Sequence, residues 1–236
     1  LKFKLKLFGD IKMKFLVISD LHGNLEVLDK MDETFKKADG VVFAGDFAKF
    51  GNEETGLPAL EKLCSKHDTI FSVIGNCDNP SFIEETEKHD ISVEKQLVMY
   101  EGLAFAGSGG GSKFTGTTPN EKSEEELMAD FKIITEQGEQ EWNNLIAVSH
   151  NPPKNTDCDK ISGGVHVGSE LFTQFIEQYK PLAVITGHIH ESAGICKVGT
   201  TTVINPGPLL EGKYAWLEVA KENGEWKVLS AELKSL

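Results

Sequence analysis

The sequence has no apolar segment long enough to cross a membrane. A transmembrane helix needs about 20 consecutive apolar residues, and no run of that length occurs among the 236 residues. The start of the chain also lacks the order of a secretory signal, in which basic residues precede an apolar stretch and then small residues. These two absences predict a soluble protein.

Cysteine is scarce and scattered. The chain has Cys64, Cys77, Cys158 and Cys196, which do not show the paired spacing of a zinc knuckle. They are also too few for the disulfide framework of a small secreted domain. We therefore expect reduced thiols and a cytoplasmic location.

Positive charge is in deficit. The 24 basic residues face 37 acidic ones, so the formal net charge is −13. Such a chain is repelled at long range by nucleic acid and by anionic membranes, and we expect neither as a partner. A bound cation can still dominate the local field. A small anionic substrate held by metal ions therefore remains compatible with the composition.

Length and hydrophobic content predict one domain, because 236 residues with 39% hydrophobic side chains can bury a single core. Within residues 1–12, Lys first alternates with Leu or Phe, and Gly9 and Asp10 follow. This pattern predicts a strand and a turn. Met13 has the character of an original start. We expect the domain to span 13–236 and residues 1–12 to be a variable or artificial extension without a functional role.

Short apolar runs that end in a potential metal ligand recur along the chain. Their length and β-branched content are typical of buried strands. The runs and the polar residues that follow them are 15–18 with Asp20, 41–44 with Asp46, 71–74 with Asn76, 145–148 with His150, and 182–185 with His188.

Helical patterns lie between several of these runs, which predicts an α/β fold. Asn24 can cap a helix with Leu25, Leu28 and Met31 on one stripe, and the segment 171–179 carries a second stripe. Ligands of such folds gather beyond the carboxyl ends of the strands, so the polar termini can converge on one crevice. A polar residue that merely ends a strand is the better explanation for any single position, but a metal site explains the series.

The residue types favour a transition metal. Asp20 and His22 lie two positions apart at a strand end, as do His188 and His190, and such pairs project to the same side of extended backbone. Asp46, Asn76 and His150 complete a mixed nitrogen and oxygen set. This set suits manganese, iron, zinc or nickel better than calcium.

The order of these motifs resembles the calcineurin-like metallophosphoesterases, specifically a branch with Asn-Cys-Asp. Their pattern is D-x-H, G-D, G-N-H-D/E, H and G-H-x-H; here it reads Asp20-x-His22, Gly45-Asp46, Gly75-Asn76-Cys77-Asp78, His150 and Gly187-His188-x-His190. The resemblance implies a four-layer α-β-β-α sandwich of two mixed β-sheets flanked by helices. It also implies two divalent metal ions: Asp20, His22 and His190 hold one, Asn76, His150 and His188 hold the other, and Asp46 bridges them.

The activity implied by the resemblance is hydrolysis of a small phosphate ester by a hydroxide that the two metals share. Cys77 stands where many members carry a histidine that protonates the leaving group, and losing such an acid typically costs about 10²–10⁴-fold. Phosphodiesters are therefore the favoured substrates. Cys77 is either a weak proton donor or an apolar filler, and Asp78 either orients a ligand or forms a turn; we count both as candidate catalytic residues.

Three other functions are less well supported by the sequence. A binding or scaffold protein with the same fold is the alternative, because Cys77 departs from the family pattern. A nuclease would need a basic surface, and a protein phosphatase would need the Asp-Arg-Gly continuation that is missing after Asp46. A homo-oligomer is compatible with the sequence.

Several segments near these motifs carry further expectations. The glycine-rich segment 107–112 is expected to be a flexible loop, with phosphate binding by its backbone as the alternative. Residues 121–130 predict a solvated helix with a capping box of Ser123 and Glu126. His67 and His89 are expected at the surface, and His166 is a weaker candidate for reaching the substrate.

Overall fold

The computed structural model describes residues 11–236, and the strand and turn predicted within residues 1–10 lie outside this range. Strand β1 (Ile11–Ile18) begins before Met13, and its residues Ile11 and Lys12 pair with Lys221 and Ala220. The domain boundary at Met13 stays a prediction. No helix among residues 11–236 is both long and apolar enough to cross a membrane.

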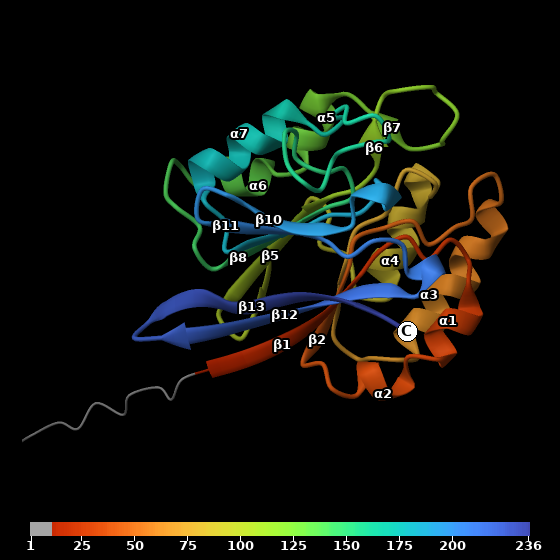
Figure 1. Ribbon diagram of the computed structural model, residues 1–236, viewed down its shortest axis with the longest axis horizontal. Coiled ribbons are helices and arrows are strands. Elements are labelled where there is room, and N and C mark those ends of the chain that lie inside the picture. The colour runs from red at the N-terminus through yellow and green to blue at the C-terminus, as the bar shows by residue number, and fades with distance from the viewer. Residues whose placement is uncertain (1–10) are drawn as a thin grey trace, which may run out of the picture.

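Two mixed sheets form the centre of the molecule (Figure 1). The first has the order β13 (Glu225–Ser235), β12 (Lys213–Glu222), β1, β2 (Gly40–Phe43) and β3 (Ile70–Ser72). The second has the order β10 (Gly194–Val198), β11 (Thr201–Asn205), β9 (Ala183–Ile185), β8 (Leu145–Ser149), β5 (Leu103–Ser108) and β4 (Val98–Tyr100). Strands β1, β2 and β3 are parallel, as are β5, β8, β9 and β11, and the flanking strands are antiparallel.

Helices cover the outer face of each sheet (Figure 1). Beside the first sheet are α1 (Leu25–Asp29), α2 (Asp32–Phe35), α3 (Gly56–Cys64) and α4 (Ile83–Lys88). Over the second sheet are α5 (Glu124–Ala129), α6 (Lys132–Thr135) and α7 (Glu170–Tyr179). Short 3₁₀ turns are η1 (Glu53–Thr55), η2 (Pro80–Phe82), η3 (His190–Ser192) and η4 (Leu209–Glu211).

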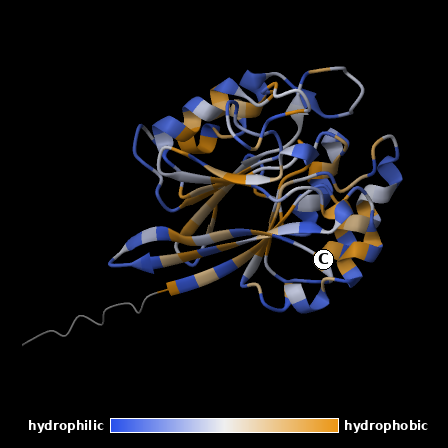
Figure 2. Cartoon of the chain, in the orientation of Figure 1, coloured by the Kyte–Doolittle hydropathy of each residue, from blue (hydrophilic) through white to orange (hydrophobic). Residues whose placement is uncertain are grey.

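Three clusters of buried apolar residues hold the sandwich together, and Figure 2 shows hydrophobic residues along the strands of both sheets. Phe15, Phe105 and Ile185 belong to the layer between the two sheets. Leu28 and Leu60 pack helices α1 and α3 on the first sheet, and Phe172 and Ile176 pack α7 on the second. Burial of apolar area is the main stabilising contribution to such a core. The predicted α/β four-layer architecture is confirmed.

All five apolar runs form strands, but they are divided between the sheets. The runs before Asp20, Asp46 and Asn76 are β1, β2 and β3, whereas those before His150 and His188 are β8 and β9. The crevice therefore lies between the ends of two stacked sheets instead of at the edge of one. The sequence pattern indicates only that a strand is buried. A strand is buried equally well in one sheet or in either of two stacked sheets, so the pattern does not distinguish these arrangements.

Two helix predictions need correction at their ends. Asn24 caps α1 as expected, with its side chain accepting from the backbone N–H of Val27, but α1 ends at Asp29 and Met31 precedes α2. Ser123 and Glu126 form the expected capping box of α5. Residues Glu121 and Lys122 were wrongly placed in that helix, since they form β7, which pairs with β6 (Gly111–Ser112).

Candidate metal centre

The seven predicted metal ligands follow the carboxyl ends of five strands, and the structure gathers them at one end of the sandwich. They are Asp20 and His22 after β1, Asp46 after β2, Asn76 after β3, His150 after β8, and His188 and His190 after β9. Ligand atoms from Asp20, His22 and His190 all lie within 4.8 Å of one another, as do those from Asp20, Asp46 and His150.

The first group consists of Asp20, His22 and His190. The Nε2 of His190 lies 3.2 Å from Oδ1 of Asp20 and 3.3 Å from Nε2 of His22. The Nε2 of His22 lies 3.8 Å from the same Asp20 oxygen. Three donor atoms therefore face one point, as a cation site requires.

The second group consists of Asn76, His150 and His188. The Oδ1 of Asn76 lies 2.8 Å from Nε2 of His150. The ring centroids of His150 and His188 are 5.2 Å apart. The backbone N–H of His188 donates to Asp20, with N–O distances of 3.3 and 3.2 Å, and so ties this group to the first.

The carboxylate of Asp46 lies between the two groups. Its Oδ2 is 3.6 Å from Nε2 of His22 and 3.5 Å from Nε2 of His150. Its Oδ1 accepts a 2.8 Å hydrogen bond from the backbone N–H of Cys77. The side chain is only 3% exposed and one oxygen is fixed by backbone, so the carboxylate orientation is set before any cation binds.

Backbone carbonyls orient two of the imidazoles. The Nδ1 of His150 is 2.6 Å from the carbonyl oxygen of Ala44, and the Nδ1 of His22 is 3.2 Å from that of Ala48. A carbonyl only accepts, so each Nδ1 carries the proton and each Nε2 presents its lone pair. This arrangement is the usual one for metal-ligating histidine.

Four of the seven residues adopt the left-handed backbone region that non-glycine residues rarely occupy. Their φ angles are 56° for Asp20, 48° for His22, 62° for Asp46 and 67° for His188. Each such conformation costs of order 1–3 kcal/mol and tends to occur where a site demands it. The strain is concentrated at the ends of β1, β2 and β9, where it turns the side chains towards the crevice.

Glycines directly before Asp46, Asn76 and His188 allow the ends of neighbouring strands to approach closely. A Cβ on Gly75 would lie 1.9 Å from Oδ1 of Asp46, and one on Gly187 would lie 2.0 Å from Oγ of Ser19. A Cβ on Gly45 would lie 2.8 Å from Nδ1 of His150. The absence of a side chain at these three glycines therefore permits the close backbone approach.

Asp78 holds the loop that carries Asp46. Its carboxylate accepts four backbone N–H groups, from Gly75 at 2.7 Å, Asp46 at 3.1 Å, Phe47 at 3.2 Å and Ala48 at 2.7 Å. Burial, followed by the charge of Asp46, raises its pKa to about 6, against the effect of these donors. Its oxygens are used within the protein, so Asp78 orients the loop.

Charges within the centre shift several other pKa values. Burial favours neutral Asp20, but the hydrogen bond from His190 and the positive charge of that imidazole outweigh burial and hold the Asp20 pKa below its usual range. The hydrogen bond to Asp20 raises the pKa of His190. Burial lowers the pKa of His188 to about 4, so its imidazole is neutral at pH 7.

Cys77 lies beside His22 and Asp46, and its sulfur belongs to the same cluster of potential ligand atoms. The side chain is 6% exposed. Burial and the negative charge of Asp46 raise the thiol pKa far above its usual range. The thiol therefore stays protonated and gives up its proton poorly.

The glycine-rich segment 107–112 is packed instead of flexible, contrary to expectation. Gly107 to Gly111 are buried, and a Cβ on Gly111 would lie 3.1 Å from Cβ of Asn76. Three N–H groups of the segment already bind protein oxygens: Gly110 binds Ile74, Gly111 binds Asn120, and Ser112 binds Asn151. These groups are not free to bind phosphate.

Sequence reasoning missed Asn120. Its side chain donates to the carbonyl of Gly75 at 3.0 Å and its backbone N–H donates to that of Asn76 at 3.2 Å, which fixes the β3 loop. Nothing in the local sequence around Pro119 signals this role. The Nδ1 of His166 lies 2.6 Å from Oδ1 of the buried Asp159. His166 is also absent from the lining of the pocket beside the centre, so it is not placed to reach a substrate there.

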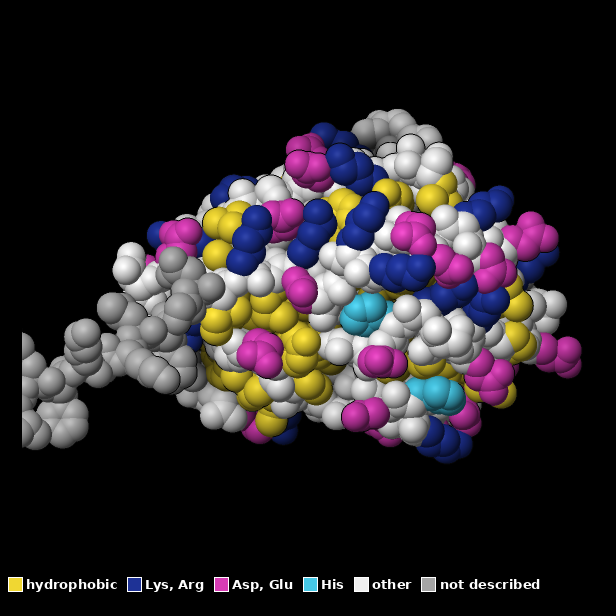
Figure 3. Space-filling model, turned by 90° about the horizontal axis from the view of Figure 1, so that it is seen from below, with side chains coloured by type: hydrophobic (Ala, Val, Ile, Leu, Met, Phe, Trp, Pro, Cys, Tyr) yellow, Lys and Arg dark blue, Asp and Glu magenta, His cyan; other side chains and the backbone are white. Residues whose placement is uncertain are grey.

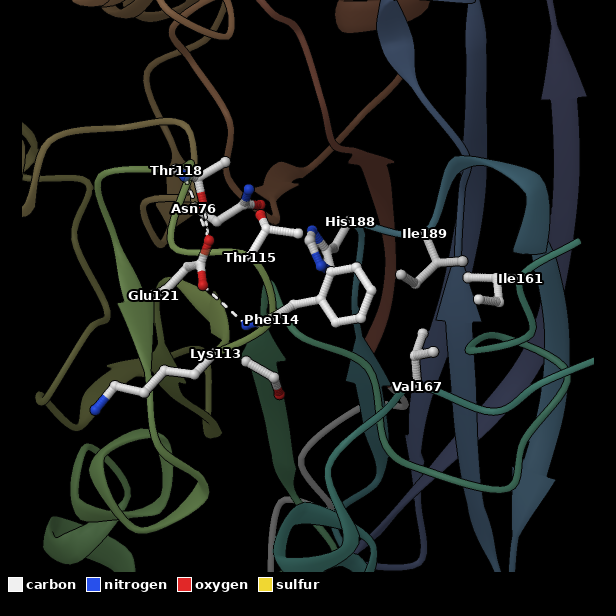
Figure 4. A pocket seen from close by; sticks show the side chains of 11 residues that line it. Asn76, Lys113, Phe114, Thr115, Thr118, Glu121, Ile161, Val167, His188 and Ile189 are labelled. Atoms are coloured by element: carbon white, nitrogen blue, oxygen red, sulfur yellow. Dashed lines mark hydrogen bonds between the residues drawn. The ribbon is translucent and has the colours of Figure 1, made fainter.

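A pocket of about 280 Å³ opens beside the second ligand group (Figure 4). Asn76 and His188 are part of its lining, and Phe114, Ile161, Val167 and Ile189 supply apolar side chains. Lys113, Glu121 and three hydroxyl side chains complete the lining. The pocket is thus continuous with the candidate metal centre.

The donor set fits two divalent cations. Six nitrogen and oxygen side chains form two groups beside the Asp46 carboxylate, and mixed donors of this kind suit first-row transition metals. A pair of cations held close together is the arrangement with which two-metal hydrolases stabilise the attacking and leaving oxygens of their substrates.

The sequence profile of the calcineurin-like phosphoesterases matches residues 13–192. The chain belongs to this family of metallophosphoesterases. An uncharacterized protein of Methanocaldococcus jannaschii is 35% identical over 202 residues, which cover 83% of this chain and 88% of that protein.

Solved structures with little sequence identity share the fold. A Thermus thermophilus protein has a TM-score of 0.70 at 18% identity, covering 95% of this chain and 99% of its own. A dimetal phosphatase from Danio rerio has a TM-score of 0.60 at 13% identity, covering 94% and 98%. GAP50, the anchor in the inner membrane complex of Plasmodium, has a TM-score of 0.51 at 12% identity, covering 95% and 89%.

Proposed function

We propose that this protein is a dinuclear-metal phosphodiesterase that hydrolyses small phosphodiesters. The position of Asp46 carries the proposal, because its Oδ2 faces His22 at 3.6 Å and His150 at 3.5 Å from the two ligand groups. Asp20, His22 and His190 would hold one cation, Asn76, His150 and His188 the other, with Asp46 shared. When bound, two divalent cations activate water and neutralise charge on the phosphate.

The residues of this chain prepare the site for that chemistry. Ala44 and Ala48 carbonyls hold the imidazoles of His150 and His22 with Nε2 turned to the centre. Asp78 fixes the Asp46 loop through four backbone N–H groups. Such pre-organisation lowers the reorganisation needed during reaction.

Two features favour a diester over a monoester. The Cys77 thiol, with its raised pKa, is a poor donor to an alkoxide leaving group, and Asp78 is engaged by backbone. The sequence contains no arginine, the side chain best suited to bidentate phosphate binding. A phosphodiester carries one negative charge and needs less neutralisation than a monoester dianion.

A scaffold without turnover is the second candidate, and Cys77 favours it because the thiol replaces the expected proton donor. The fold serves as a phosphatase in the Danio rerio protein and as an anchor in the Plasmodium protein, so fold alone does not decide. We propose that the native metal is manganese, iron, zinc or nickel, and manganese is the first to test.

The partner we propose is a small phosphate ester, and neither nucleic acid nor membrane. Lysine and acidic side chains are interspersed over the face shown in Figure 3, and the net charge is −13. An extended polyanion needs a continuous basic surface to release counterions. We also propose a cytoplasmic location, on the scarcity of cysteine. Sedimentation of the purified protein tests the homo-oligomer that is compatible with the sequence.

The test combines metal analysis with hydrolysis. Purified protein is loaded with manganese, assayed by elemental analysis, and given bis(p-nitrophenyl) phosphate and p-nitrophenyl phosphate. We expect two metal equivalents and a higher kcat/KM for the diester. Two bound metals without turnover of either ester would support the scaffold, and a preference for the monoester would contradict the diester assignment.

A further inference from the structure

The apolar wall of the pocket comes from segments far apart in the sequence. Phe114 lies between β6 and β7, Ile161 and Val167 lie on the loop after β8, and Ile189 lies between two predicted ligands. Figure 4 shows the ring of Phe114 directed towards the side of the pocket that holds His188, Ile189 and Val167. The apolar wall is therefore next to the place where the phosphate would be held.

Phe114 is the most exposed large hydrophobic side chain among residues 11–236, with 88% of its surface accessible. Leaving a Phe side chain in water forgoes the roughly 1.5–3 kcal/mol that burial would supply. A ligand that covers the ring would recover part of this free energy.

The loop that presents Phe114 is braced from within. The carboxylate of Glu121 accepts the backbone N–H groups of Phe114 at 2.8 Å, Gly116 at 3.0 Å, Thr117 at 3.1 Å and Thr118 at 3.3 Å. It also accepts from Oγ1 of Thr118 at 3.1 Å. The exposed ring is thus held on an ordered turn.

We infer that this pocket is the subsite for a planar aromatic substituent of the phosphodiester, with Phe114 as its stacking face. The inference rests on the proposed function and names its substrate class. A dry cavity of about 150 Å³ accommodates benzene, and the 280 Å³ here leaves room for an aryl ring or a nucleobase. Ile161, Val167 and Ile189 then contact the edge and opposite side of the guest.

An aromatic guest fits this lining better than a long alkyl chain. A ring offers a face to Phe114, and stacking on an aromatic side chain contributes about 1–3 kcal/mol. The polar share of the lining, with Ser112, Thr115 and Thr118, suits a ring that bears heteroatoms. The shared chemistry is the flat ring, and it can come from a nucleoside or from a simple aryl alcohol.

The first experiment varies only the group that the product retains. O-methyl, O-cyclohexyl, O-phenyl and O-thymidin-5′-yl S-ethyl phosphorothiolates all release ethanethiol, which is small and is measured with Ellman's reagent in quenched samples. We expect kcat/KM for the phenyl and thymidinyl esters to exceed that for the cyclohexyl ester by about 5-fold or more. Preference for thymidinyl over phenyl identifies a nucleoside source, and the reverse identifies a simple aryl source. Equal values for cyclohexyl and phenyl would overturn the inference.

Variants of Phe114 test the stacking face. In Phe114→Ala the phenyl-to-methyl ratio of kcat/KM should fall by about 5- to 100-fold, and Phe114→Tyr should restore it. Leu229→Ala, which removes a 44% exposed apolar side chain on β13, is the matched control and should keep the wild-type ratio. An unchanged ratio in Phe114→Ala would contradict the assignment.

Glu121 acts through Phe114 as a positioning residue. Glu121→Ala should lower the phenyl-to-methyl ratio in the wild-type background but produce no further decrease in the Phe114→Ala background. Additive effects of the two substitutions would show that Glu121 acts independently of the ring.

Calorimetric binding separates this inference from the proposed function. Manganese-loaded protein should bind phenylphosphonate at least about 5-fold more tightly than methylphosphonate, and Phe114→Ala should abolish the difference. Tighter binding of phenylphosphonate without diester hydrolysis would refute the phosphodiesterase activity and support the aromatic subsite. Equal binding of the two phosphonates with diester hydrolysis intact would sink the subsite alone.

Discussion

The Nε2 atoms of His22 and His190 lie 3.3 Å apart, although 168 positions separate the two residues. The Nδ1 of His22 faces the carbonyl of Ala48 at 3.2 Å, which leaves its Nε2 lone pair turned towards His190 and Asp20. Two imidazoles and a carboxylate in this arrangement are stabilised when a cation lies between them. This geometry and the loops that support it lead to five predictions.

Asp46→Asn removes the shared negative charge while keeping the shape of the side chain. We expect a lower metal content and at least about a 100-fold loss of diester kcat. Mutation of a residue that only hydrogen-bonds to a metal ligand already lowers metal affinity or activity by about 10–100-fold. Elemental analysis and hydrolysis of a chromogenic diester measure the two effects. Asp157→Asn, whose side chain is 73% exposed, controls for the charge change. Wild-type metal content and rate in Asp46→Asn would refute the bridging assignment.

Gly75→Ala should disrupt the centre by steric overlap alone. The added Cβ would lie 1.9 Å from Oδ1 and 2.3 Å from the backbone nitrogen of Asp46, so the β3 and β2 loops must separate. We expect loss of bound metal together with a lower urea midpoint. Gly56→Ala, at the first residue of α3, is the matched control, because its Cβ would lie 3.4 Å from Ala48 and Phe82, which is an ordinary contact. That variant should be neutral or more stable by roughly 0.5–1 kcal/mol.

Substitutions of Cys77 address the leaving-group proton. Because the thiol pKa is raised by burial and by Asp46, we expect Cys77→Ala to keep the wild-type ratio of monoester to diester hydrolysis. Cys77→His should increase that ratio by at least about 10-fold, since a positioned general acid contributes about 10²–10⁴-fold. An unchanged ratio with histidine would show that this position does not control leaving-group protonation.

Glu121 should titrate at unusually low pH. The hydrogen bond from the backbone N–H of Phe114, with those from Gly116 and Thr118, lowers its pKa from 4.5 to about 2. A lowered carboxyl pKa stabilises the folded loop above pH 4.5, and this contribution is lost as the pH falls towards 2. The ¹³C shift of the Glu121 carboxyl, followed by NMR, should have its midpoint near pH 2. A midpoint near 4.5 would mean that the brace does not form.

Asp78→Ala leaves four buried backbone N–H groups without their acceptor. Hydrogen bonds to a charged group contribute about 1.5–3 kcal/mol each, and their losses overlap, so we expect the free energy of unfolding to fall by about 3 kcal/mol or more. Asp78→Asn should lower the free energy of unfolding by less, because its amide oxygen still accepts hydrogen bonds from these N–H groups. Urea denaturation measures both, with the exposed Asp68→Ala expected within about 0.5 kcal/mol of wild type. A similarly small change in Asp78→Ala would refute the bracing role.

Local sequence predicted the elements that carry the centre but not all of their ends. The apolar runs before Asp20, Asp46 and His150 form strands because β-branched and apolar residues favour buried extended backbone. Helix α1 ended sooner than its stripe suggested, and Glu121 with Lys122 formed a strand. The strand at Glu121 and Lys122 depends on pairing with Gly111 and Ser112, which the periodicity of a single segment does not report.

By itself, the sequence determined which side chains can coordinate cations and the order of the strands that carry them. Only the tertiary structure decided that β1 to β3 and β8 to β9 belong to different sheets, that Asp46 faces both groups, and that Asn120 and Glu121 brace neighbouring loops. The physical reason is range. Strand formation follows from neighbouring residues, whereas the orientation of the Asp46 carboxylate and the close contacts of the glycines depend on packing between segments far apart in the chain.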